Sequence, residues 1–219
     1  MRNRAAHGFL KAQDSWLDVL VLDLVTIPLT RAVARIGLVS PNAVTWFGLL
    51  TRVASVALFF RDEVVGAVVL FGLGLLADGV DGKLARLTGR TSAFGGRLDY
   101  FGDVALYGVL TIAVGVGSDV PPWLYGVCAA TDVASALVTA DNRLPQQLAA
   151  APTTWRARHG LVAAPGSLET HAALFLVAPL VSRTTVVVVM VVSTCYYAAA
   201  FGVKCAGIRR LDDRNRARQ

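Results

Sequence analysis

Long apolar runs alternate with short polar segments along most of the chain. Six runs contain few charged residues, and they cover 42–60, 64–77, 98–117, 123–140, 168–182 and 184–203. A helix needs about 20 apolar residues to cross the hydrocarbon core of a bilayer, and it satisfies its backbone hydrogen bonds internally. The pattern therefore predicts an all-α polytopic membrane protein with six transmembrane helices.

Residues 15–36, ahead of the first run, follow a different pattern. Asp14, Asp18 and Asp23 recur at steps of four and five among apolar residues, so a helix would carry them on one face. This arrangement is typical of an amphipathic helix that lies in the membrane interface. Pro28 is expected to break that helix, because proline lacks the backbone N–H that a helix interior uses.

Composition and charge agree with a membrane protein. Of the 219 residues, 55% are hydrophobic and only 16% are charged, whereas a soluble domain has about 25% charged residues. All but three of the 21 lysines and arginines fall on one side of the six-span topology, and the exceptions are Arg52, Arg61 and Arg183. Because lysine and arginine accumulate in cytoplasmic segments, both termini are predicted to be cytoplasmic. The net charge of +6 then needs no nucleic-acid partner.

These patterns divide the chain into three parts. Residues 1–40 form a cytoplasmic N-terminus with the interfacial helix, residues 41–203 form the six-helix transmembrane domain, and residues 204–219 form a basic cytoplasmic tail. The first residues include basic side chains but no apolar stretch directly after them, so no cleavable signal peptide is predicted.

Four aspartates lie where the second run ends and the third begins. Asp78 and Asp81 are three residues apart, and Asp99 and Asp103 are four apart, so each pair shares one face of its helix. A cytoplasmic hairpin would bring all four together near the membrane surface, where unpaired carboxylates repel each other strongly. Oxygen ligands suit Mg²⁺ or Mn²⁺, and two such ions can clamp a phosphoryl group. The sequence therefore predicts a two-metal site.

The residues around these aspartates strengthen that interpretation. Gly82 and its neighbouring glycines allow a ligand to approach the backbone closely, and Arg86 offers a planar fork for phosphate. A purely structural role is the competing interpretation, in which the aspartates cap helices and balance nearby cations. Those cations are Lys83, Arg86, Arg90 and Arg97.

The spacing of these residues resembles the signature of the CDP-alcohol phosphotransferase family, also called class I CDP-alcohol phosphatidyltransferases. The signature D-x2-D-G-x2-A-R-x8-G-x3-D-x3-D is filled at every fixed position by Asp78, Asp81, Gly82, Ala85, Arg86, Gly95, Asp99 and Asp103. The similarity extends to the six spans, the preceding amphipathic helix and a Pro-Asn-x-x-Thr start to the first span, formed by Pro41, Asn42 and Thr45.

The resemblance implies an activity and a role for each matching residue. It implies transfer of a phosphatidyl group from a CDP-linked lipid, most directly CDP-diacylglycerol, to the hydroxyl of a polar alcohol, with release of CMP during phospholipid biosynthesis. Asp78 and Asp99 would bridge two Mg²⁺ or Mn²⁺ ions, Asp81 and Asp103 would complete the two sites, and Asp103 would act as the base toward the acceptor. The CDP moiety would be held by Asn42, Thr45, Gly82, Ala85, Arg86 and Ser92. A homodimer is implied as well.

The acceptor is less well defined. Family members that use phosphorylated acceptors tend to carry arginines near the ends of spans four and five, whereas this chain has Glu169 and His171 at the start of span five. This departure argues against a phosphorylated acceptor. Arg143, Arg156 and Arg158 in the preceding loop are the remaining candidates for contact with a phosphate.

Two charged residues lie inside predicted spans, Arg52 in the first and Asp132 in the fourth. A charge within the bilayer is costly unless it is paired or reaches the interface. The sequence leaves three arrangements open: the two residues pair with each other, Arg52 extends to the interface, or Asp132 faces an acceptor pocket.

The sequence leaves two other functions open. One is transfer from a soluble CDP-alcohol to a lipid alcohol. The chemistry is the same, but the lipid is then the acceptor and not the CDP-linked donor. The other is divalent-cation transport, which predicts charged residues near the midplane of several helices and no need for Arg86.

Overall fold

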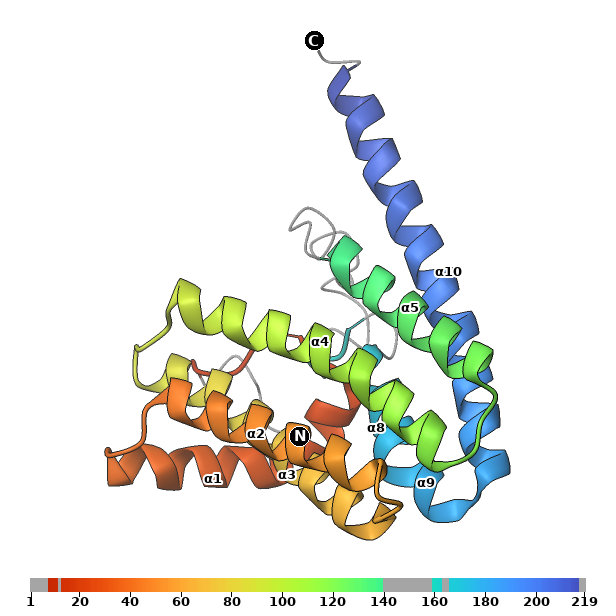
Figure 1. Cartoon of the computed structure of the whole chain (residues 1–219). Helices are drawn as coiled ribbons and strands as arrows, with labels where there is room; N and C mark the ends of the chain where they lie inside the picture. Colours follow the sequence, from red (N-terminus) through yellow and green to blue (C-terminus); the bar gives the residue numbers. More distant parts are fainter. Residues whose placement is uncertain (1–7, 12, 140–158, 163–165, 217–219) are drawn as a thin grey trace.

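The computed structural model describes residues 8–11, 13–139, 159–162 and 166–216, and these residues are almost entirely helical (Figure 1). Within these ranges the only β-structure is one isolated bridge between Asp14 and Leu161. The prediction of an all-α fold is confirmed. The elements are η2 (Asp18–Leu22), α1 (Asp23–Ile36), α2 (Pro41–Phe59), α3 (Val64–Leu87), α4 (Ala93–Gly117), α5 (Pro122–Thr139), α8 (Ser167–Ala172), η3 (Ala173–Val177), α9 (Ala178–Val181) and α10 (Arg183–Arg216), with η denoting π-helix.

Four of these helices are long and apolar enough to cross a membrane: α2, α3, α4 and the Arg183–Arg209 part of α10. Two further apolar stretches are shorter, namely Pro122–Val138 in α5 and Ser167–Val181, which combines α8, η3 and α9. The six-span count therefore stays a prediction for these two segments. Within Ser167–Val181, the π-helical turn η3 is followed by Pro179, and these two irregularities interrupt the regular α-helix.

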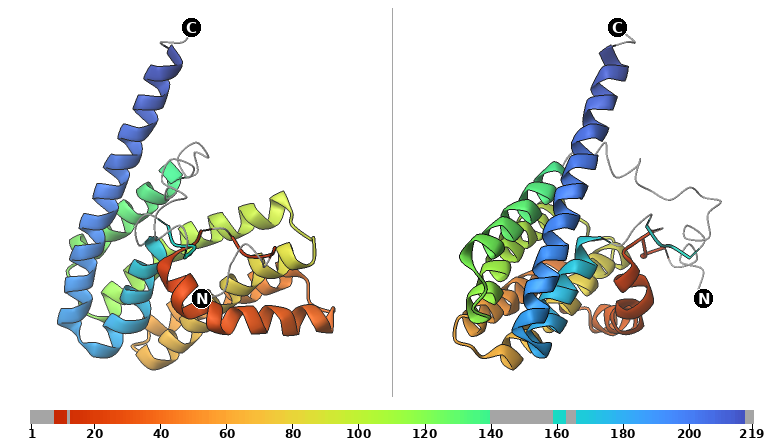
Figure 2. Two further views of the ribbon diagram at one scale, coloured as in Figure 1. Left: turned by 180° about the vertical axis from the view of Figure 1, so that it is seen from behind. Right: turned by 90° about the vertical axis from the view of Figure 1, so that its right-hand side faces the viewer.

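Helices α1 to α4 lie side by side on one flank of the molecule, and α5 pairs with α10 on the other (Figures 1 and 2). The α8–η3–α9 stretch lies between these two groups. Helix α10 extends well beyond the other helices, and it continues without interruption past residue 203. The predicted boundary between transmembrane domain and tail is therefore not marked by a change in secondary structure.

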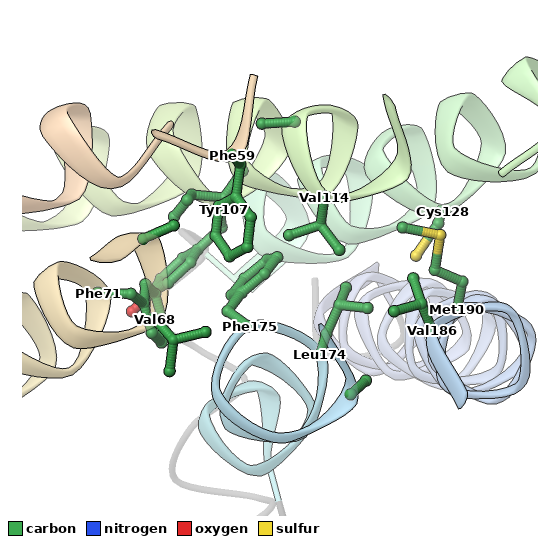
Figure 3. Close-up of a cluster of buried hydrophobic side chains, with 14 of the residues drawn as sticks. Phe59, Val68, Phe71, Tyr107, Val114, Cys128, Leu174, Phe175, Val186 and Met190 are labelled. Atoms are coloured by element: carbon green, nitrogen blue, oxygen red, sulfur yellow. The ribbon is translucent and has the colours of Figure 1, made fainter. Parts of the chain in front are cut away.

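Aromatic and aliphatic side chains from both groups meet in one buried core (Figure 3). The ring of Phe71 on α3 lies 5.1 Å from that of Phe175 on η3 and 6.4 Å from that of Tyr107 on α4. Edge-on ring pairs of this kind add about 0.5–1.5 kcal/mol to simple burial. The core thus fixes α4 and η3 relative to α3, which carries the first two signature aspartates.

Three helix ends meet at one end of the bundle, namely the starts of α2 and α4 and the end of α3. Ser40 caps α2 by accepting a hydrogen bond from the backbone N–H of Ala43, and Ser92 caps α4 in the same way through Gly95. The start of α4 lies directly against the start of α2. A Cβ added to Gly95 on α4 would lie only 2.9 Å from the Asn42 Oδ1 on α2. The end of α3 joins these two starts and completes the end of the bundle that carries the signature.

The expected break at Pro28 was wrong, because α1 runs through this proline without interruption. The amphipathic pattern exists, but its polar face points into the protein: Asp18, Asp23 and Thr26 are buried. The apolar face, with Leu24 among others, is exposed. An apolar outward face suits contact with lipid, and the interfacial location of this helix remains a prediction.

Candidate active site

A cavity of about 480 Å³ opens where the ends of α2, α3 and α4 meet the N-terminal segment and α8. Every residue predicted for metal or CDP binding lines this cavity, although the residues come from three helices and one loop. They are Asn42, Thr45, Asp78, Asp81, Gly82, Ala85, Arg86, Ser92, Asp99 and Asp103. The helix packing therefore gathers the whole signature around one space.

Three of the four signature aspartates converge. Asp78, Asp99 and Asp103 each offer a carboxylate oxygen within 4.8 Å of the others. Asp81 lines the same cavity, but its Oδ2 accepts a hydrogen bond from the Thr45 hydroxyl at 2.5 Å and its side chain is buried. A set of ligands made only of carboxylate oxygens fits a hard divalent cation, so these residues can hold the predicted ions.

One side of the cavity is built around Arg86. Its Nε donates a hydrogen bond to the backbone carbonyl of Phe9 at 2.7 Å, which fixes the plane of the guanidinium. The terminal nitrogens lie over Gly82, where an added Cβ would come within 3.4 Å of Nη1. Ser92 uses its hydroxyl to cap α4 and lies beside Gly95. These contacts hold a cationic fork next to a backbone that carries no side chain.

Lys83 does not balance the signature aspartates. Its Nζ lies 3.0 Å from an Asp18 oxygen, 3.1 Å from an Asp23 oxygen and 3.0 Å from the Thr26 hydroxyl, and it is buried. Burial raises the pKa of Asp18 to about 6, against the lowering effect of Lys83. Lys83 therefore anchors the N-terminal helices to α3, which argues against the structural interpretation in which it neutralises the signature.

Arg52 contacts the aspartates instead. Its Nη1 donates to Oδ1 of Asp103, and its Nη2 donates to Oδ1 of Asp78 at 2.9 Å. The side chain is only 2% exposed. Its partners are Asp78 and Asp103 rather than Asp132, so the expected pairing of Arg52 with Asp132 was wrong. Its reach toward the interface stays a prediction.

Asp132 instead meets His171, whose Nε2 lies 2.8 Å from its Oδ2, and both side chains are buried. The His171 ring stacks on Tyr107 with centroids 3.8 Å apart and lines the cavity. Tyr107 follows Asp103 by one helical turn on α4, so His171 lies on the Asp103 side of the site. The loop candidates Arg143, Arg156 and Arg158 fall outside the described residues.

Sequence reasoning did not assign Arg52 or Tyr107 to the site, yet a signal for each was present. Arg52 follows Thr45 by seven residues, or two helical turns, and therefore shares its face. Tyr107 follows Asp103 by four residues and shares the face of the aspartates on α4. The carbonyl contact from Phe9 to Arg86 had no such signal, because it joins residues 77 positions apart.

The chain is similar to known proteins in sequence and in fold. Over 70 residues, which are 32% of this chain and 36% of the relative, the sequence is 37% identical to archaetidylinositol phosphate synthase from Pyrococcus horikoshii. The fold is similar to the crystal structure of Mycobacterium tuberculosis phosphatidylinositol phosphate synthase (PgsA1) in apo form, with a TM-score of 0.57 and 20% identity over 84% of this chain and 93% of that one. The sequence model of the CDP-alcohol phosphatidyltransferase family matches residues 38–203. The chain therefore belongs to the CDP-alcohol phosphatidyltransferase family.

Proposed function

We propose that this protein transfers a phosphatidyl group from a CDP-linked lipid, most directly CDP-diacylglycerol, to the hydroxyl of a polar alcohol and releases CMP. Family membership supports the class of reaction, which is group transfer from a CDP-alcohol. It argues against divalent-cation transport, as does the position of the aspartates at one end of the bundle. Transfer from a soluble CDP-alcohol to a lipid alcohol is the alternative within the family.

One observation carries the proposal: converging carboxylates and a fixed guanidinium face the same cavity. Asp78, Asp99 and Asp103 supply anionic oxygens within 4.8 Å of one another. Arg86 lies along the same cavity with its guanidinium over Gly82. A diphosphate needs both kinds of group, because its oxygens bind arginine directly and bind carboxylates only through a cation.

The proposed metal ligands are Asp78, Asp81, Asp99 and Asp103, and the ions are Mg²⁺ or Mn²⁺. Bound ions would neutralise charge on the diphosphate and polarise its phosphorus–oxygen bonds. The family generally uses divalent metals. The Thr45 hydroxyl orients the Asp81 carboxylate toward the cavity by donating to one of its oxygens.

In the proposed reaction the acceptor's hydroxyl oxygen bonds to the phosphorus that bears the lipid, and the bond from that phosphorus to the CMP oxygen breaks. Asp103 takes the hydroxyl proton, as a positioned general base does. Arg86 and the backbone at Gly82 hold the nucleotide phosphates, while Asn42, Ala85 and Ser92 form the neighbouring wall of the cavity. The rest of the acceptor, beyond its reacting hydroxyl, lies toward His171.

We place the cavity at the cytoplasmic surface of the membrane, with both termini on that side. The lysine and arginine distribution supports this orientation, because Arg61 and Arg183 belong to the opposite end of the bundle. An interfacial cavity suits a reaction between one lipid and one water-soluble substrate. A homodimer is proposed from the family resemblance alone.

The test is CMP release by the purified protein from radiolabelled CDP-diacylglycerol, with a panel of polar alcohols and with Mg²⁺, Mn²⁺ or excess EDTA. We expect release only with a metal and at least one acceptor. Asp78→Asn should abolish release, whereas Asp119→Asn should retain it, since Asp119 lies in the loop after α4 at the far end of the bundle. Full turnover in excess EDTA would refute the proposal. CMP release from CDP-ethanolamine but not from CDP-diacylglycerol would also refute it.

A further inference from the structure

Arg52 is the cation that joins the two halves of the signature. It projects from α2 and contacts Asp78 on α3 and Asp103 on α4. Its side chain is 2% exposed, whereas those of Asp78 and Asp103 are 27% and 25% exposed. The arginine thus lies behind the carboxylates, and the carboxylates lie between it and the cavity.

The surrounding helices are shaped to admit this side chain. A Cβ on Gly74 would lie 2.6 Å from the Arg52 Cγ, so any larger residue there would displace the arginine stem. The guanidinium carbon lies 5.6 Å from the centre of the Tyr107 ring, which is a favourable position for a cation. The buried Nε has no hydrogen-bond partner among the described residues. The two carboxylates and the ring therefore hold the charged end in place.

The position of Arg52 changes the charge that the site presents to metal ions. Four aspartates carry four negative charges, and Arg52 cancels one. One divalent ion would leave a single negative charge, and a second would make the cluster net positive beside a buried guanidinium. Like charges in such a poorly solvated place repel strongly, and a diphosphate ligand would remove that repulsion.

We propose that Arg52 acts as a fixed internal cation that makes metal binding sequential: one divalent ion binds the free protein, and the second binds only together with the CDP diphosphate. Arg52 is thus a positioning residue that acts through Asp78 and Asp103. This inference rests on the proposed function, because it concerns the order in which the same site fills.

The experiment is a Mn²⁺ titration of the full chain in detergent, followed by electron paramagnetic resonance, with and without CDP. The wild type should bind one Mn²⁺ alone and show the exchange-coupled spectrum of a close Mn²⁺ pair only after CDP is added. Arg52→Met should bind the pair without CDP, with affinity for the second ion raised roughly 5- to 150-fold, the usual range of coupling between sites. Arg52→Lys should restore sequential binding, and Arg61→Met, a matched change at an exposed loop, should behave as wild type.

The outcomes separate this inference from the function on which it rests. A coupled pair in the wild type without CDP overturns the role of Arg52, and so does an unchanged titration of a folded Arg52→Met variant. If Arg52→Met does not fold, the wild-type titration and Arg52→Lys decide the matter. If the wild type binds no Mn²⁺ even with CDP, the metal-dependent function itself fails, and the inference fails with it.

Discussion

Replacement of Gly95 by alanine tests whether the start of α4 forms part of the nucleotide site. A Cβ at this position would lie 2.9 Å from the Asn42 Oδ1 and 3.0 Å from the Ser92 Oγ. Ordinary contact begins at 3.4 Å, so Asn42 must retreat by about 0.5 Å, which is the difference between 3.4 and 2.9 Å. Both neighbours line the proposed CDP wall.

The expected effect on stability is small. Alanine in a helix is more stable than glycine by about 0.5–1 kcal/mol, while disturbance of the Ser92 cap costs a share of the about 0.5–2 kcal/mol that a cap contributes. These terms nearly cancel. The effect on catalysis is not compensated, because a displacement of about 1 Å in a substrate-positioning group can cost about 100-fold in catalytic efficiency. For half that displacement we expect kcat/KM for the CDP-lipid to fall about tenfold, and the loss should appear as a higher KM because Asn42 and Ser92 are proposed to bind the nucleotide.

Two measurements check this expectation: CMP release as a function of CDP-lipid concentration, and thermal unfolding followed by circular dichroism in detergent. Gly202→Ala is the matched control, since Gly202 lies in α10 with no atom within 4 Å of an added Cβ. It should leave the KM unchanged. The reasoning is refuted if Gly95→Ala keeps the wild-type KM, or if its KM rises only together with a large loss of stability.

Four further substitutions test individual roles. Asp103→Asn should lower the transfer rate by about 10²–10⁴-fold while CDP-lipid affinity survives. Asp78→Asn should instead lose metal affinity and nucleotide affinity together. If both variants lose rate and affinity in the same proportions, Asp103 has no separate role. Arg86→Lys should raise the KM for the CDP-lipid about 10- to 100-fold, because it loses a charged hydrogen bond worth about 1.5–3 kcal/mol. An unchanged KM would show that Arg86 only balances charge. His171→Gln keeps a hydrogen-bond donor toward Asp132. It should raise the KM for the acceptor about tenfold, the equivalent of one lost hydrogen bond, and leave the KM for the CDP-lipid unchanged. A change confined to the KM for the CDP-lipid would show that the acceptor binds elsewhere.

The fold class and most of the site could be predicted because they depend on spacing within single helices. Steps of three and four put Asp78 with Asp81 and Asp99 with Asp103, and the short polar hairpin between them forces the two pairs to meet. The same reasoning failed at Pro28. The missing N–H of proline removes one intrahelical hydrogen bond, but α1 continues from Asp23 to Ile36 because its buried face, with Thr26, Ile27 and Thr30, packs against the protein on both sides of the proline.

The contacts that could not be predicted join residues on different helices. Arg52 and Asp103 are 51 positions apart, and His171 and Asp132 are 39 apart. Apolar helices offer little sequence information about which neighbour each will pack against, since lipid-facing and protein-facing surfaces are both apolar. A buried charge shows that some partner is required, but the choice among partners depends on the packing of the whole bundle.

The signature specifies the carboxylates and their spacing, and it is the same whether or not a cation lies behind them. Arg52 lies outside the signature, on α2, yet it contacts two of the four aspartates. The charge that the site offers to metals and diphosphate is therefore a property of the fold rather than of the motif. Two chains with identical signatures can differ in metal affinity and in the order of ligand binding if they differ at this one position.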